Sequence, residues 1–389
     1  MLRSAPLLVF ALAAAQVACA TGSELAPGPR DDEGPAVVSI GSPDDDSATT
    51  ALAPSEAPAA PATAAACAAP SAVCGGACVR LSDDAANCGA CGRSCDGTAC
   101  IAGRCAPSSV VTLAKGVADL DVARGIVFVS DGVTPAVLLP GTRTPVKLPD
   151  LGGITSGFRV VGGLVAFADA AAITTVDPAG GATQPLFSGR HAPRIAGFTL
   201  GLLDWVEAAP ERGEGHERLL VGDVYWHDHG VVAESPEPIA FVSSVYYSTY
   251  FVTASGKVFR ALRDTSPEGN APPTVIAELD GAPAAFAATY GLVAWARGGE
   301  PYLRGLSTRT QEAYTSPRLA AAPRLLLSDE AAVYFTVEDP AGTTVYRVSP
   351  SEPTPRSMWT TTDRLTHLRA DDRALYFATT AGTVWRLLK

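Results

Sequence analysis

Short apolar runs that end in an aromatic residue recur along the chain from about residue 108 onward. The runs are GIVF, LVAF, LLDW, TYF, LVAW, VYF and LYF, and they end at Phe128, Phe167, Trp205, Phe251, Trp295, Phe335 and Phe377. Successive aromatic residues are 39, 38, 46, 44, 40 and 42 positions apart. This period is typical of four-stranded propeller blades, whereas helical repeats would show apolar faces with a 3.6-residue period. The pattern predicts an all-β domain at 108–389 that folds as a seven-bladed β-propeller.

A second motif follows the aromatic residue in four of the repeats. It ends in arginine, at Arg260, Arg304, Arg347 and Arg386, nine residues after the aromatic in three repeats and twelve in the fourth. Aromatic residues repeated in this way are expected to pack between blades. We expect the four arginines to make hydrogen bonds from blade to blade rather than to form a ring that binds carboxylates.

The last repeat stops at GTVWRLLK, which corresponds to the third strand of a blade. The segment SSVVTLAKG at 108–116 precedes the first repeat and is similar to the fourth strands of the other repeats. We expect this N-terminal strand to pair with the last blade and close the ring, because an unpaired strand edge invites aggregation.

The runs VYFT and LYFAT, with the preceding LLLSDEA and LRADDRA, resemble exported propellers of the YWTD-like type over nearly all of 108–389. Propellers of that type usually have six blades, and this sequence has seven anchors. The resemblance therefore implies the propeller architecture and nothing finer.

Eight of the nine cysteines lie close together before the propeller. They are Cys67, Cys74, Cys78, Cys88, Cys91, Cys95, Cys100 and Cys105. A segment of this size, 67–105, cannot bury enough apolar surface to fold unaided, so we expect four disulfides, each worth about 2–4 kcal/mol. Zinc is the alternative for close-set thiolates, and an exported chain argues against it. The pairing stays open, because eight cysteines allow about 105 connectivities.

The segment CGGACVRLSDDAANCGACGRSCDGTACIAGRC resembles the Stig1-type cysteine-rich repeat. The shared elements are C-x3-CV, D-x3-NCG-x-CG-x2-C and a final C-x4-C. The resemblance extends to modules in secreted myxobacterial proteins. It implies an extracellular interaction or spacer module, and it implies no catalysis.

The N-terminal 18 residues have a basic start at Arg3, an apolar run at 7–15 and small residues at the end. This is the pattern of an export signal peptide. The apolar run is shorter than a membrane-spanning helix, which needs about 20 apolar residues. We therefore expect the mature chain to be soluble or tethered.

The ninth cysteine, Cys19, decides between these two states. The sequence QVAC at 16–19 resembles a bacterial lipobox, in which the cysteine is acylated, with Gln16 in place of the usual leucine. Because the other eight cysteines form an even set, the remaining one favours lipidation. Ordinary cleavage after Ala20 is the alternative. Residues 20–66 are rich in Ala, Pro, Ser and Asp, and they predict a disordered linker.

The chain carries 29 Lys and Arg residues against 40 Asp and Glu residues, which gives a net charge of −11, and it has no basic cluster. This composition argues against nucleic acid as a partner. Nucleophile elbows, H-E-x-x-H, P-loops and dinucleotide glycine patterns do not occur in the sequence. No cofactor is indicated, and the catalytic residues of any enzyme would be unknown.

The third repeat is enlarged at 207–236, and this stretch contains His216, His227, Asp228 and His229. Residues two apart on a strand face the same side, so His227 and His229 are candidate metal ligands. Glu217 or Asp223 would add a carboxylate. An exposed hairpin tip explains the same residues without a metal, and we favour that interpretation.

Together these features predict a binding or scaffold protein of the cell envelope or extracellular space, whose propeller face binds a protein or a glycan. It would be secreted or lipid-anchored, at the outer membrane, with the lipid as its membrane attachment. The alternative is a propeller hydrolase or lyase that acts on an extracellular polymer. Catalysis predicts perturbed carboxylates or histidines at the channel mouth, binding predicts a flat or aromatic-rich face, and a pure spacer predicts neither.

Overall fold

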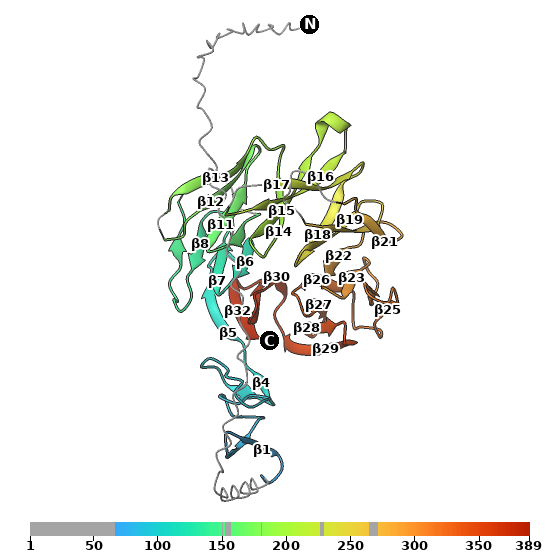
Figure 1. The fold of residues 1–389 in the computed structure, drawn as a ribbon. Coiled ribbons are helices and arrows are strands. Elements are labelled where there is room, and N and C mark those ends of the chain that lie inside the picture. The colour runs from blue at the N-terminus through green and yellow to red at the C-terminus, as the bar shows by residue number, and fades with distance from the viewer. Residues whose placement is uncertain (1–66, 150, 152–156, 180, 226–228, 264–270) are drawn as a thin grey trace, which may run out of the picture. The chain divides into compact units, whose positions relative to one another are not determined.

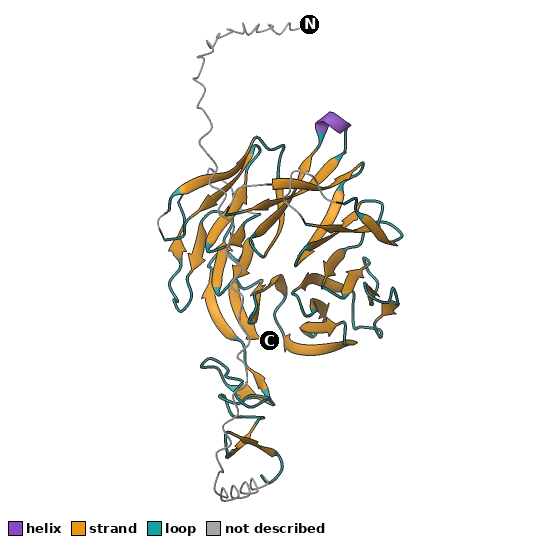
Figure 2. Ribbon diagram, viewed as in Figure 1, coloured by secondary structure: helices purple, strands orange, loops and turns teal. Residues whose placement is uncertain are grey.

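The computed structural model describes residues 67–149, 151, 157–179, 181–225, 229–263 and 271–389. Across these ranges it contains β-strands and one short 3-10 helix, η1 (Pro210–Arg212) (Figure 2). Seven antiparallel sheets of four strands each are the seven blades of a propeller (Figure 1). The predicted fold class is therefore confirmed. The lipobox at Cys19 and the linker at 20–66 lie outside the described residues.

Each of the first six blades is built from four strands that follow one another in the sequence. Blade 1 contains β6 (Asp119–Ala123), β7 (Ile126–Ser130), β8 (Pro135–Leu138) and β9 (Val146–Lys147). Blade 2 contains β10 (Arg159–Val161), β11 (Leu164–Ala168), β12 (Ala172–Val176) and β13 (Thr183–Ser188). Blade 3 contains β14 (Arg194–Thr199), β15 (Leu202–Ala208), β16 (Glu217–Asp223) and β17 (His229–Ser235).

The second half of the ring follows the same order. Blade 4 contains β18 (Ile239–Val245), β19 (Ser248–Thr253), β20 (Lys257–Leu262) and β21 (Thr274–Glu278). Blade 5 contains β22 (Ala285–Ala288), β23 (Leu292–Ala296), β24 (Leu303–Ser307) and β25 (Ala313–Thr315). Blade 6 contains β26 (Pro323–Ser328), β27 (Val333–Asp339), β28 (Gly342–Ser349) and β29 (Glu352–Thr361). Blade 7 contains β30 (Leu365–Ala370), β31 (Ala374–Thr379), β32 (Thr383–Leu388) and, from the other end of the domain, β5 (Ser108–Thr112).

The second strand of every blade carries the repeated aromatic residue, and all seven of these residues are buried. Every residue of β19 and β31 is buried. Blades pack face to face, so a second strand is covered on both sides and its sequence is a continuous apolar run instead of an alternating one. This explains why the anchors were visible in the sequence.

Aromatic stacking links neighbouring blades. The rings of Phe128 and Phe158 lie 4.4 Å apart between blades 1 and 2. Trp205 of blade 3 stacks on Phe187 of blade 2 at 4.8 Å. The predicted inter-blade packing of the aromatic series is confirmed at these seams, where each pair adds about 0.5–1.5 kcal/mol beyond its buried area.

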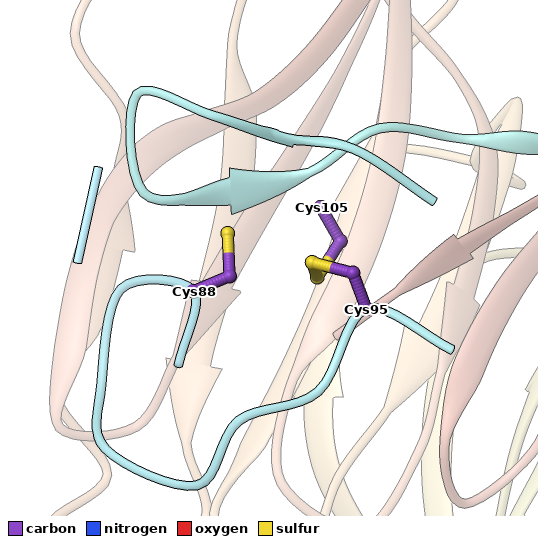
Figure 3. Close-up of side chains that lie close together, drawn as sticks. All are labelled: Cys88, Cys95 and Cys105. Carbon is purple, nitrogen blue, oxygen red and sulfur yellow. A yellow bond between two sulfur atoms is a disulfide. The ribbon is translucent and has the colours of Figure 1, made fainter. Parts of the chain in front are cut away.

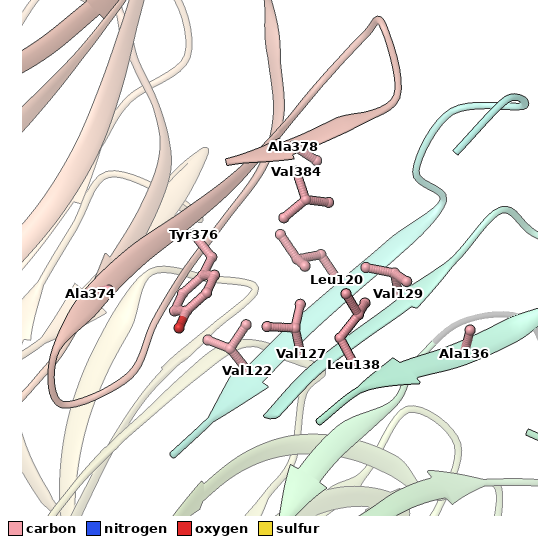
Figure 4. Packing of buried hydrophobic residues seen from close by; sticks show 10 residues of the cluster. All are labelled: Leu120, Val122, Val127, Val129, Ala136, Leu138, Ala374, Tyr376, Ala378 and Val384. Carbon is pink, nitrogen blue, oxygen red and sulfur yellow. The ribbon is translucent and has the colours of Figure 1, made fainter. Parts of the chain in front are cut away.

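The ring closes as the sequence predicted. β5 pairs antiparallel with β32, with Val111 opposite Val384 and Ser109 opposite Trp385. Figure 4 shows the resulting seam, in which Leu120 and Val122 of blade 1 face Tyr376 and Val384 of blade 7.

The arginine series lies on the third strands, and among the described residues its partners do not include the predicted blade-to-blade hydrogen bonds. Arg260 donates to Ser248 Oγ and Arg304 to Glu300, and Arg347 lies 3.8 Å from Glu352, all within one blade. Arg386 instead pairs with Asp96 of the cysteine module at 3.1 Å. The third strand lies outside the tightest contacts between blades, so its long side chains reach polar partners within their own blade.

The cysteine module contains two short hairpins, β1 (Ser71–Cys74) with β2 (Ala77–Arg80) and β3 (Cys100–Ile101) with β4 (Arg104–Cys105). Four disulfides join Cys67 to Cys78, Cys74 to Cys91, Cys88 to Cys100, and Cys95 to Cys105. Gly89 of the Asn-Cys-Gly motif has φ of +75°, and a Cβ there would lie 2.4 Å from the carbonyl oxygen of Gly103. Only glycine fits this close approach.

Three of these cysteines, Cys88, Cys95 and Cys105, have sulfur atoms within 4.8 Å of one another (Figure 3). They form the one group of metal-ligating side chains found among the described residues. Because all three are in disulfides, they are not thiolates that could hold zinc. Over the same residues, no helix is long and apolar enough to cross a membrane.

Candidate functional site

The first strands of the seven blades form the inner wall of the propeller. Each of them contacts the first strands of both neighbouring blades. A cavity of about 260 Å³ lies among them and is lined by residues from all seven strands. Its lining is more polar than apolar and includes the charged side chains of Asp121, Arg159 and Arg369. The hydroxyls of Ser243 and Ser328 approach to 3.2 Å between blades 4 and 6. The channel is therefore narrow at that level.

Two aspartates of β6 are buried, and Asp121 lines this channel. Asp121 accepts a hydrogen bond from the Val160 amide at 2.8 Å and lies 3.3 Å from Arg369. Asp119 accepts one from the Phe158 amide at 3.2 Å. Burial raises the pKa of Asp121, and the nearby Arg159 and Arg369 oppose that shift. Because both carboxylates accept backbone amides of blade 2, they stabilise the contact between blades 1 and 2.

One end of the channel opens into a wider mouth of about 510 Å³. The mouth is lined by the turns that connect the first and second strands of blades 1, 3, 6 and 7, and by the end of β18 in blade 4. In blades 1 to 4 these turns are only two residues long. The rest of the blade does not cover the side chains of such short turns, so these side chains lie at the surface at this end of the propeller.

Large side chains gather on the turns of blades 3 to 5. We call Leu200, Tyr225, Tyr246, Tyr247 and Tyr290 the aromatic arc. Tyr225 is 60% exposed, Tyr247 66% and Tyr290 55%, and these three are all of the exposed aromatic side chains among the described residues. Tyr225 comes from the β16 to β17 connection, and its ring lies against Gly162 and Gly201 of two neighbouring turns.

Within the aromatic arc, the rings of Tyr246 and Tyr290 meet edge to face at 6.0 Å. The guanidinium of Arg309 lies 5.2 Å from the centre of the Tyr290 ring. Tyr246 donates a 2.6 Å hydrogen bond to Glu330 of blade 6, and this bond raises the pKa of the phenol. Tyr246 therefore stays protonated and joins the aromatic arc to the next part of the rim.

The turns of blades 6 and 7 are acidic. We call Asp329, Glu330, Asp371 and Asp372 the acidic arc, and all four line the mouth. Asp329 and Asp371 also hold their own turns, because each accepts two backbone amides of the turn and a tyrosine hydroxyl. Glu330 and Asp372 are exposed. Arg124 of blade 1 is the one basic residue in the lining.

A fully buried ion pair supports the aromatic arc. Arg263 bonds both carboxylate oxygens of Asp204, at 3.0 Å and 2.9 Å, and neither side chain is exposed. The same guanidinium donates to the carbonyl oxygens of Thr199, Leu202 and Tyr246. One side chain thereby fixes the turn of blade 3 to the turn of blade 4.

Two of the arc residues have unfavourable backbone conformations. Leu200 has φ of +55° and Tyr246 φ of +50°, in the left-handed region that favours Gly and Asn. A bulky residue in this region costs about 1–2 kcal/mol. Strain of this kind at an exposed turn indicates that the side chain has a use other than folding.

Replacing Leu200 by asparagine is therefore expected to stabilise the protein. Because asparagine tolerates the left-handed region, we expect a gain of about 0.5–1 kcal/mol, or roughly 2 °C in melting temperature. Differential scanning calorimetry would measure it, with Leu164→Asn as a control at an exposed strand position. A loss of stability in Leu200→Asn equal to that in Leu164→Asn would contradict the strain.

His216 and His229, two of the histidines singled out in the sequence, are not brought together. His216 lies at the tip of the β15 to β16 hairpin, whereas His229 pairs with Gly222 near the other end of β16. About six residues of strand separate the two positions, or roughly 20 Å. His229 packs near Phe187 and Trp205 at 5.6 Å and 6.1 Å. His227 and Asp228 lie outside the described residues, so the proposed His227 and His229 pair is not described.

The two carboxylates considered with those histidines have local partners. Glu217 accepts the Ile239 amide at 2.7 Å, and Asp223 accepts the Tyr225 amide at 2.8 Å. Asp223 thus shapes the connection that carries Tyr225.

The sequence interpretation missed the mouth, although a signal was present. The rim residue stands five positions before the repeated aromatic in six of the seven blades: Gly162, Leu200, Tyr246, Tyr290, Glu330 and Asp372. Arg124 stands four positions before Phe128. Aligning the repeats on their anchors and comparing this single column would have found the site.

Comparison with known proteins adds to this geometry at the cysteine module. Residues 56–108 match the model of the stigma-specific STIG1-like protein family. This match agrees with the resemblance seen in the sequence, and it covers a small part of the chain. No curated protein matches the chain.

Several solved propellers are similar to the chain. PorZ, a bacterial surface component of the type IX secretion system of Porphyromonas gingivalis, aligns with a TM-score of 0.52 and 12% identity over 73% of this chain and 38% of its own. The designed protein Ika8 has a TM-score of 0.49 and 12% identity over 72% of this chain and 98% of the Ika8 chain. An inactive virginiamycin B lyase of Staphylococcus aureus, with quinupristin, has a TM-score of 0.47 and 12% identity over 73% of this chain and 99% of the lyase chain. At such identities the PorZ likeness shows the fold alone, and this chain spans well under half of PorZ.

Proposed function

We propose that this protein is a binding or scaffold protein of the cell envelope or extracellular space, and that the mouth of its propeller is the surface that binds a protein or a glycan. The observation that carries the proposal is the aromatic arc. All of the exposed aromatic side chains of the described residues belong to it. Tyrosine provides large contact area at low entropic cost and is enriched in binding surfaces.

A catalytic role has less support. The buried carboxylates of β6, Asp119 and Asp121, accept backbone amides of the neighbouring blade. His367 bonds Thr366 at 3.0 Å, and burial lowers its pKa, so it is neutral near pH 7. These groups are engaged in the wall, whereas the exposed tyrosines face outward, as a docking surface requires.

The proposal is tested with arrays of oligosaccharides and peptides, probed with the mature protein. Replacing Tyr247 and Tyr290 by serine is expected to weaken binding of the array ligands at least tenfold, because exposed aromatic anchors dominate such surfaces. Val133→Ser is the matched control, since Val133 is 67% exposed at the opposite end of blade 1. Ligands that bind the double variant as tightly as the wild type would contradict the proposal.

The proposal includes the location of the protein in the cell. The signal peptide, the lipobox at Cys19, the 20–66 linker and the YWTD-like and myxobacterial resemblances support an exported, tethered propeller. Replacing Cys19 by serine is expected to move the protein from the membrane fraction to the soluble fraction. Detection by immunoblot after fractionation measures this, with Cys67→Ser as a control that breaks a disulfide and leaves the lipobox intact. Unchanged membrane association of Cys19→Ser would show that the anchor is not there.

A further inference from the structure

The rim of the propeller mouth is divided by chemistry. The acidic arc lines the mouth on blades 6 and 7, and Leu200 of the aromatic arc lines it on blade 3. The tyrosines of the aromatic arc lie next to the mouth, on connections of blades 3 to 5. The bond between Tyr246 and Glu330 marks the border. A ligand that covers the mouth therefore meets apolar rings on one side and carboxylates on the other.

The acidic arc keeps negative charge available to a ligand. Burial alone would raise the pKa of Asp329, but the Lys389 ammonium, 2.6 Å away, holds it below its usual range. That ion pair neutralises the charge of Asp329, so Asp329 is not available to a ligand. Glu330 and Asp372 are exposed at the rim. Arg124, the basic residue of the lining, lies on the blade 1 turn whose Gly125 amide donates to Asp371.

The protein itself shows how this rim accommodates a cation. Lys389 Nζ lies 5.5 Å from the centre of the Tyr334 ring while it bonds Asp329 and the carbonyl oxygen of Asp371. Arg309 lies in a similar way beside Tyr290. Tyrosine faces next to carboxylates favour ammonium and guanidinium groups, through cation-π attraction and ion pairing.

We infer that the ligand of the mouth is a basic peptide segment of a partner protein, with apolar side chains on the aromatic arc and lysine or arginine side chains on the acidic arc. This inference rests on the proposed function and specifies its ligand. Charge complementarity selects this occupant, because neutral glycans would bring no counter-ion to Glu330 and Asp372, and acidic polymers would be repelled.

The test uses the mature full chain and three synthetic peptides of four repeats each: Gly-Lys-Leu, the same peptide with acetylated lysines, and Gly-Glu-Leu. Isothermal titration calorimetry measures affinity at low and physiological salt. The lysine peptide is expected to bind at least tenfold more tightly than either other peptide, and to weaken as salt rises. Equal binding of the acetylated peptide would overturn the inference.

Variants locate the site. The double change Glu330→Gln with Asp372→Asn is expected to weaken the lysine peptide about five- to tenfold, since each exposed ion pair contributes modestly. Glu214→Gln with Asp363→Asn removes the same charge from exposed positions at the other face and is expected to leave affinity within twofold. Equal weakening by the two double variants would show a general attraction to an acidic chain and would overturn the inference.

Failure of this inference is distinguishable from failure of the proposed function. A neutral oligosaccharide or acidic peptide whose affinity falls with Tyr247→Ser and Tyr290→Ser would leave the mouth as the binding surface and overturn the basic ligand. Absence of any ligand that depends on these two tyrosines would overturn both.

Discussion

Replacing Arg263 by methionine is expected to lower the free energy of unfolding by about 3–5 kcal/mol, because it leaves the Asp204 carboxylate buried without its counter-ion. Both side chains of the pair are fully buried. For a domain of this size the change corresponds to roughly 6–15 °C in melting temperature. Urea unfolding followed by tryptophan fluorescence would give the free energy.

Arg260→Met is the matched control, because Arg260 lies three residues before Arg263, is exposed, and bonds only to Ser248 among the partners described for it. It is expected to change stability by less than about 0.5 kcal/mol. Adding Asp204→Leu to Arg263→Met is expected to recover part of the loss, since no unpaired charge remains. A melting temperature for Arg263→Met equal to that of Arg260→Met would show that the pair does not support the turns.

Removing β5 is expected to have the second large effect. We compare a chain that begins at Pro107 with one that begins at Val117, so that the two differ only in the closing strand and the turn after it. Val110, Val111 and Leu113 pack on the seam between blades 7 and 1. Their loss is expected to cost about 3–6 kcal/mol, at roughly 1–2 kcal/mol for each partly buried side chain.

The shorter chain also exposes the edge of β32, so it is expected to associate at higher concentration. Thermal unfolding and analytical ultracentrifugation of both chains measure the two effects. If both chains melt together and remain monomeric, the pairing of β5 with β32 is not what closes the ring.

The propeller could be predicted from the sequence because one physical signal was repeated seven times. A strand covered on both faces must be apolar throughout, so the runs that end at Phe128 or Phe377 survive the divergence of the surrounding turns. The closing strand followed from the same logic, since a blade that lacks its fourth strand needs a partner. The cysteine module was evident from its spacing, while its pairing depended on three-dimensional proximity.

The mouth could not be predicted in the same way, because its members have no common chemistry. Tyr246 and Asp372 occupy the same position of the repeat, yet one is aromatic and the other acidic. The support from Arg263 and Asp204 joins residues 59 positions apart, and nothing local marks either as buried. The arginines after the anchors were conspicuous in the sequence, yet three of the four bond within their own blade and Arg386 pairs with Asp96 of the cysteine module. A motif that recurs from blade to blade can follow from blade geometry alone and need not mark a site.

The position of β5 has a mechanical consequence. Only Ala106 and Pro107 separate the last cysteine of the module from this strand, and its four residue pairs with β32 are what attach it within the blade. Tension on the N-terminal segment is transmitted through the cross-linked module with little extension. It reaches the propeller at Ser108 and at the module's side-chain contacts with blades 6 and 7, where Arg104 donates to the carbonyl oxygens of Ser357 and Met358 and Asp96 pairs with Arg386. The load therefore falls first on the blades beside the closing seam, and the blades on the opposite side of the ring bear it only after that seam has opened.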